Sequence, residues 1–175
     1  MQGYLLDTQT IRYWFDGKSG QFPAVEANAQ RYAANSPLYV SVVTLGEIEY
    51  GHASNPDGAG ARRDEFLRFL AQLPQRLEVS RHTAEPYGRV RACLAQKFPP
   101  AGGWHKKKRA EQLYDPVTAL ALGIDENDLW LVAQAVERNL VLVSSDKMNR
   151  IREAVAEVYG SFRVEDWSVP PTPGA

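Results

Sequence analysis

Short apolar runs alternate with longer amphipathic segments along most of this chain. The runs at 4–6, 38–43 and 140–143 have the composition of buried strands, and the second is rich in β-branched and aromatic residues. Elsewhere apolar residues recur at helical spacing, as Leu129, Val132, Ala133 and Val136 do. Strands that alternate with helices predict an α/β domain with a mostly parallel, right-handed wound sheet.

Weaker patterns complete the predicted order of elements. Helices are expected from Thr8 through Trp14, over 23–34, over 61–73, from Thr83 onward, and after Asp146 through Ile151, Val155 and Val158. Short strands are expected over 77–79 and 162–164. The chain of 175 residues and 19.5 kDa fits one domain with one insertion, and we expect it to span 1–168, followed by a disordered proline-rich tail over 169–175.

Charge and cysteine content narrow the classes of protein. A net charge of −1 gives no general attraction to nucleic acid, so any such binding requires a local basic patch. A single cysteine, Cys93, cannot form an internal disulfide, which is typical of a reducing cytoplasm. The sequence has no signal-peptide pattern and no apolar run of membrane-spanning length, so we expect a soluble, cytoplasmic protein.

Common cofactor motifs are missing from the sequence. The glycines of the 54–60 loop do not follow a strand, so they make no dinucleotide-binding motif, and no phosphate-binding lysine motif occurs. His52, His82 and His105 are scattered and have no cysteine partner at metal-binding spacing. The sequence therefore predicts neither a nucleotide cofactor nor a zinc site.

Four carboxylates are predicted to meet at one edge of the sheet. Asp7 and Asp146 follow buried strands directly, Glu47 follows the second strand, and Asp128 lies in the first turn of a helix. The carboxyl ends of parallel strands open on the same edge, where α/β proteins bind their ligands. The 124–146 segment supplies two of these acids, and we expect it to organise the site.

Each acid also has a purely structural interpretation. Asp7 could cap the helix that follows it, and the polar residues at 125–128 could cap theirs and complement its dipole. Thr44 and Glu47 have the spacing of a capping box, in which Glu47 would bond back to the backbone of Thr44. Ser144 could likewise cap a strand end, or it could hold a carboxylate or a water.

The chemistry of the four acids indicates a cation. Four carboxylates in one crevice repel one another unless a cation compensates their charge. Hard oxygen ligands without histidine or thiolate favour Mg²⁺ or Mn²⁺. Such an ion can activate water and neutralise charge on a phosphodiester.

One concentrated basic run lies between the helix expected from Thr83 onward and the helix that contains Asp128. His105 is followed by Lys106, Lys107, Lys108 and Arg109. The run could be a solvated loop or a patch that contacts RNA phosphates.

Taken together, these motifs resemble the PIN-domain ribonucleases, specifically the VapC-like toxins of bacterial and archaeal type II toxin-antitoxin modules. The 18-residue separation of Asp128 and Asp146 also resembles the family spacing. The resemblance covers nearly the whole chain and rests on the segments 4–8, 41–51, 87–91, 126–129, 142–146 and 163–167.

The resemblance implies a PIN-like three-layer α/β fold, with a mostly parallel five-stranded sheet between helices. It also implies Mg²⁺- or Mn²⁺-dependent endoribonuclease activity, a homodimer, and inhibition by a cognate antitoxin. It assigns catalytic and metal-binding roles to Asp7, Glu47, Asp128 and Asp146, and a supporting polar role to Ser144. The chain departs from the family at Gln9, at Val132 and in a longer stretch at about 101–122, where the predicted insertion lies.

Two other functions remain possible from the sequence. A PIN-like RNA-binding or regulatory module would keep the acids without cleaving RNA. A haloacid-type phosphotransferase would need a second aspartate two residues after Asp7, where the chain has Gln9. The intact set of four acids favours the nuclease.

Overall fold

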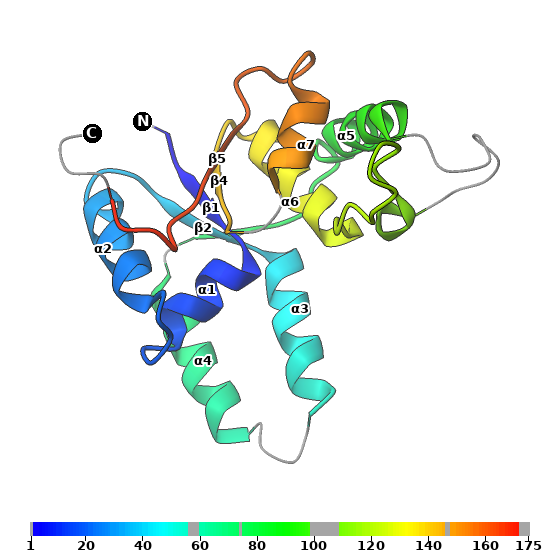
Figure 1. Ribbon diagram of the computed structural model, residues 1–175. Helices are drawn as coiled ribbons and strands as arrows, with labels where there is room; N and C mark the ends of the chain where they lie inside the picture. Colours follow the sequence, from blue (N-terminus) through cyan, green and yellow to red (C-terminus); the bar gives the residue numbers. More distant parts are fainter. Residues whose placement is uncertain (1, 56–59, 74, 99–108, 146–147, 172–175) are drawn as a thin grey trace.

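The chain forms a five-stranded parallel sheet between two layers of helices (Figure 1). This computed structural model describes residues 2–55, 60–73, 75–98, 109–145 and 148–171. The strands lie in the order β3-β2-β1-β4-β5, and every neighbouring pair is parallel. Their bounds are β1 Tyr4–Leu6, β2 Leu38–Ser41, β3 Gln75–Leu77, β4 Val141–Val143 and β5 Arg163–Glu165.

Helices follow the strands in the predicted alternation. Their bounds are α1 Thr8–Phe15, α2 Phe22–Ala33, α3 Val42–Ala53, α4 Gly60–Gln72, α5 Ala84–Lys97, α6 Glu126–Glu137 and α7 Met148–Val155, with a short 3₁₀ helix, η2, at Ala110–Gln112. None of the helices within the described ranges is long and apolar enough to cross a lipid bilayer.

The two faces of the sheet bury separate apolar clusters because side chains alternate along each strand. Leu5 and Leu142 face α5, α6 and α7, whereas Leu6, Val40 and Val143 face α1, α2, α3 and α4. Figure 1 shows these two groups of helices on opposite sides of the sheet. The predicted three-layer α/β fold is therefore confirmed.

The central strand, β1, ends at the same edge of the sheet as both of its neighbours, and a site can form at that edge. Leu6, its last residue, pairs with Val40 of β2 and Val143 of β4. The next residue, Asp7, donates its backbone N–H to the Val143 carbonyl at 3.0 Å. The chain leaves all three strands at the same edge of the sheet, and α1, α3 and the start of α6 gather there.

Three predicted boundaries are wrong. The second strand ends at Ser41, and Val42 and Val43 already belong to α3. The third strand lies at Gln75–Leu77, so it overlaps the predicted 77–79 only at Leu77. The last helix ends at Val155, and Val158 is an exposed residue beyond it.

The described part of the predicted insertion, 109–122, is a compact loop. Leu113 and Leu122 are buried in the cluster formed with α5, α6 and α7, and a bridge pairs Tyr114 with Ala121. Asp115 accepts backbone N–H groups of the following turn, and these hydrogen bonds lower the pKa of its carboxyl. The loop leads directly into α6 and its acidic first turn.

Candidate functional site

Three of the four predicted acids line one cleft at the carboxyl edge of the sheet. Asp7, Glu47 and Asp128 belong to the lining of a cleft of about 850 Å³. The first turns of α1 form one side of it, α3 forms a second and the first turns of α6 form a third. The structure therefore places these three residues along the lining of the same cleft.

Asp7 combines a structural role with its place in the cleft. It follows β1, is only 4% exposed, and caps α1 by accepting the backbone N–H of Thr10 at 2.7 Å. The Thr10 hydroxyl in turn donates to the Val143 carbonyl at 3.2 Å, which ties the start of α1 to β4. The capping interpretation is correct, and it also explains how the chain holds a buried carboxylate at this position.

Asp128 is fixed in a similar way. It forms a reciprocal capping box with Asp125, in which the Asp128 N–H donates to Asp125 Oδ1 at 3.0 Å and the Asp125 N–H donates to Asp128 Oδ2 at 2.8 Å. Both carboxylates also line the cleft. The two acids at the start of α6 thus cap the helix and also contribute negative charge to the cleft.

Glu47 does not make the predicted capping box. Ser41 caps α3 by accepting the Val43 N–H at 3.0 Å, so Thr44 lies inside the helix rather than at its start. The Thr44 side chain is buried, and its hydroxyl has no hydrogen-bond partner within the part of the chain that the structure describes. Glu47 is therefore one turn further into α3 than a capping residue would be.

Glu47 instead joins three helices through its two carboxylate oxygens. The Thr8 hydroxyl of α1 donates to Oε2, and the Asn127 amide of α6 donates to Oε1 at 2.8 Å. Sequence reasoning gave Asn127 only a capping role. Its position directly before Asp128, on a helical turn predicted to lie at the site, could have indicated a role in the cleft.

A buried polar link behind the cleft was also missed. The Ser41 hydroxyl donates to Gln134 Oε1 at 2.5 Å, and Gln134 Nε2 donates to the Leu77 carbonyl at 3.4 Å. Ser41 and Gln134 are both fully buried. This link connects the ends of β2 and β3 to α6.

Trp130 adds an aromatic surface to the α6 wall. It lines the cleft and stacks on Tyr87 of α5, with ring centroids 4.0 Å apart and an interplanar angle of 13°. The Tyr87 hydroxyl donates to Glu126 at 2.6 Å, and Arg91 pairs with Glu126 at 3.2 Å. Burial raises the pKa of Tyr87, and the hydrogen bond to Glu126 raises it further.

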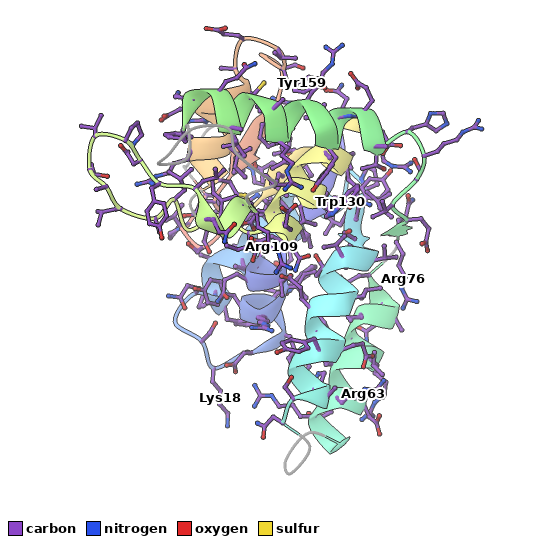
Figure 2. All side chains as sticks on the ribbon, turned by 90° about the vertical axis from the view of Figure 1, so that its right-hand side faces the viewer. Lys18, Arg63, Arg76, Arg109, Trp130 and Tyr159 are labelled. Atoms are coloured by element: carbon purple, nitrogen blue, oxygen red, sulfur yellow. The ribbon has the colours of Figure 1, made fainter. Side chains whose placement is uncertain are left out.

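The remaining predicted residues lie apart from the cleft lining or beyond the described chain. Ser144 is buried at the end of β4, where its N–H donates to the Glu165 carbonyl at 2.9 Å. Asp146 and Lys106, Lys107 and Lys108 lie outside the described residues. Arg109 is exposed, and the N–H of the next residue donates to Glu126, so Arg109 lies beside the start of α6 (Figure 2).

The acids of the cleft have the donor atoms that a divalent cation would need. Asp7, Glu47 and Asp128 present hard carboxylate oxygens to one cleft, which is the chemistry that Mg²⁺ or Mn²⁺ requires. Within the described ranges no three acidic, histidine or cysteine side chains are close enough together to hold an ion. The three acids therefore have the oxygen chemistry that a hard cation needs, but within the described ranges they do not form a complete ligand group, and Asp146 is the predicted further donor.

The cleft lies at the carboxyl ends of the strands of a parallel α/β sheet, which is where α/β domains bind their ligands. A family model of the PIN domain matches residues 4–154. The chain therefore belongs to the PIN-domain family. Comparison with curated protein sequences gives no match.

Solved structures with the same fold come from several bacteria. A chain of VapBC2 from Rickettsia felis, bound to a promoter DNA fragment, is 19% identical with a TM-score of 0.65, over 94% of this chain and 98% of that one. A chain of DNA-bound VapBC from Salmonella typhimurium is 21% identical with a TM-score of 0.61, over 95% of this chain and 99% of that one. A chain of VapBC-1 from nontypeable Haemophilus influenzae is 18% identical with a TM-score of 0.63, over 95% of this chain and 98% of that one. At these identities the likeness concerns the fold.

Proposed function

We propose that this protein is a Mg²⁺- or Mn²⁺-dependent endoribonuclease that cleaves RNA phosphodiesters with activated water. The observation that carries the proposal is the meeting of Asp7, Glu47 and Asp128 in one cleft of a PIN-family domain. A bound divalent cation would supply Lewis acidity toward water and the phosphodiester. Asp146 and Ser144 complete the proposed site on the strength of their motif positions.

The chain holds its carboxylates rigidly before any ligand binds. Asp7 is fixed by the α1 cap, Asp128 by its capping box with Asp125, and Glu47 by donors from two other helices. A preorganised set of acids binds a cation or orients water without paying for side-chain ordering. The same hydrogen bonds set the spacing between the walls that would receive the RNA backbone.

We further propose that the nuclease is the toxin of a type II toxin-antitoxin module. Support comes from the similar folds, which belong to structures described as VapBC. The proposal includes a cognate antitoxin that inhibits cleavage, a homodimer and a cytoplasmic location. Inhibition by the product of a small adjacent reading frame would test the partner directly.

The alternative is a PIN-like RNA-binding module that does not cleave. The observation that favours it is the engagement of all three described acids in structural hydrogen bonds, since Asp7 and Asp128 cap helices and Glu47 links them. Both functions predict RNA binding. Only the nuclease predicts that cleavage depends on a divalent cation and on each carboxylate.

A cation-titrated cleavage assay separates the two functions. Asp7→Asn and Asp128→Asn keep a side-chain oxygen for the cap but remove the charge, so each should fold normally and lose on the order of a hundredfold or more of the cleavage rate. Asp64→Asn, on the exposed surface of α4, is the matched control and should cleave as the wild type does. Wild-type rates in Asp7→Asn and Asp128→Asn, or cleavage that persists in EDTA, would contradict the proposed nuclease.

A further inference from the structure

Trp130 differs from the tryptophans of the core. Trp14 and Trp167 pack in the cluster between the sheet and α1, α2 and α4, and their indole N–H groups donate to Glu26 and Glu165. Trp130 is half-buried at the cleft, and its N–H makes no hydrogen bond within the described ranges. Packing in the hydrophobic core therefore does not explain why a large aromatic ring lies on this wall of the cleft.

The ring is held in a fixed orientation. Tyr87 stacks against one face at a centroid distance of 4.0 Å, and in Figure 2 Trp130 lies between α5 and the upper end of α3. Tyr87 is itself held by Glu126 and by Arg91, whose Nη1 donates to the Tyr87 hydroxyl at 2.6 Å. A ring braced in this way loses little conformational entropy when a ligand contacts it.

The cleft around Trp130 also has a second aromatic ring, a cation and open space. Tyr50 lines the α3 wall and is 75% exposed, and Gly46 on the same wall has no atom within 4 Å of the position that a Cβ would occupy. Arg12 lines the cleft from α1, with its guanidinium 3.5 Å from the corresponding position at Gly51. Across the described chain the Arg12 side chain makes no ion pair or hydrogen bond.

We propose that the cleft contains a nucleobase subsite for single-stranded RNA, in which an unpaired base stacks beside Trp130. Tyr50 contacts the neighbouring nucleotide, and Arg12 contacts the phosphate between them. Unpaired bases are recognised by stacking on aromatic side chains, and stacking tolerates any base because every base has a π-face. This inference rests on the proposed function, since it concerns how the same cleft selects single-stranded over duplex RNA.

Binding measured in EDTA tests the subsite without any cleavage. The probes are a fluorescently labelled single-stranded RNA, the same RNA with abasic positions, and its duplex. Trp130→Leu should weaken binding of the intact single strand by about tenfold or more, while Trp130→Phe stays within about threefold of wild type. Abasic substitution should weaken the wild type and have little effect on Trp130→Leu, because the stacking partner is already lost.

Two matched pairs separate the subsite from general surface effects. Tyr50→Ala should weaken binding about threefold, whereas Tyr114→Ala, which removes an exposed tyrosine outside the cleft, should not. Arg12→Gln should weaken binding and lower its salt dependence, whereas Arg76→Gln on edge strand β3 should do neither. Tyr50 is too exposed for its loss to unfold the chain, so this arm remains informative if Trp130→Leu is unstable.

Clear outcomes overturn the proposal. Equal affinity of wild type and Trp130→Leu, equal weakening by Trp130→Phe and Trp130→Leu, or equal wild-type affinity for duplex and single strand would each rule out the stacking subsite. The proposed nuclease is judged separately, by cation-dependent cleavage. A protein that binds single strands through Trp130 but never cleaves would keep the subsite and lose the nuclease, and the reverse result would lose only the subsite.

Discussion

Glu47 shows how a single side chain can serve the fold and the site at once. Its carboxylate accepts from Thr8 on α1 and from Asn127 on α6, so it joins three helices around the cleft. A glutamate that only stabilised this junction would need acceptor oxygens, whereas one that also binds a cation needs its charge. Replacing the charge while retaining much of the shape separates these two roles.

Glu47→Gln is expected to lower the cleavage rate strongly with a small loss of stability. Glutamine can keep both contacts, because its oxygen can still accept from the Asn127 amide while its N–H group donates to the Thr8 hydroxyl, so the cost should be no more than about 1 kcal/mol. Cleavage should fall on the order of a hundredfold if the carboxylate takes part in cation binding. Rates at saturating Mg²⁺ or Mn²⁺ and urea unfolding in EDTA provide the two readouts.

Glu49→Gln is the matched control for this prediction. Glu49 lies on the same helix and pairs with Arg63 at 2.9 Å, but it is not part of the cleft lining. Both partners are more than 40% exposed, so losing the pair should cost no more than about 1 kcal/mol and leave cleavage unchanged. Equal activity in the two variants would assign Glu47 a structural role only.

Which residues lie at the site could be predicted better than what holds them there. Asp7 and Asp128 are adjacent to element boundaries that the apolar pattern marks clearly, so sequence reasoning placed them at the cleft and anticipated their caps. Asn127 was assigned only to capping, because its partner, Glu47, is 80 residues away in the chain. Sequence spacing carries no information on such long-range hydrogen bonds.

At the scale of elements, the placement of α3 depends on where β2 ends. The β-branched residues Val42 and Val43 favour a strand by propensity, yet the structure begins the helix there. Ser41 supplies the reason, since its hydroxyl caps α3 and donates to Gln134 in the buried interior. A tertiary hydrogen bond with no sequence signature thus overrides local preference and moves Glu47 one turn deeper into the helix.

Ser41→Ala is expected to destabilise the protein by about 1–3 kcal/mol. The substitution removes a helix cap and leaves the buried Gln134 carbonyl without its donor. Ser54→Ala, at the exposed C-terminal end of α3, is the control and should change stability by less than about 0.5 kcal/mol. Urea unfolding of both variants measures the difference, and comparable midpoints would show that the Ser41–Gln134 link contributes little.

Edge elements were harder to predict than central ones. The strands β1 and β4 are buried on both faces and read as continuous apolar runs. In β3, by contrast, Gln75 and Arg76 are exposed and only Leu77 is buried, so no alternating pattern fixes its register. Val158 follows the helical spacing of Ile151 and Val155, but α7 ends at Val155 and leaves it exposed.

The parallel topology of the whole molecule brings the acids together. With β1 between β2 and β4, the chain leaves three adjacent strands at one edge, and this order follows the general rules for wound α/β sheets. The result is an acidic cleft on a protein with a net charge of −1. An RNA backbone approaching this cleft is repelled by the carboxylates unless local positive charge offsets them.

The basic run is expected to supply that charge. Arg109 lies beside the start of α6, and Lys106, Lys107 and Lys108 directly precede it in the sequence. Replacing all four by Ser or Gln should weaken RNA binding across sequences and flatten its dependence on salt, with cleavage of saturating substrate little changed, because each phosphate contact releases counterions. Binding constants measured between low and physiological salt give the slope.

A charge-matched variant distinguishes a local patch from the general field of the molecule. Replacing Lys18, Arg68, Arg76 and Arg138, which are all exposed, by Gln removes the same number of positive charges, and Lys18 and Arg76 lie well apart from Arg109 in Figure 2. If the basic run contacts phosphates, its loss should lower the salt slope far more than the loss of these four. Equal slopes in the two variants would mean that net charge alone governs the approach of RNA, and an unchanged slope in both would leave the run as a solvated loop or a contact for the antitoxin.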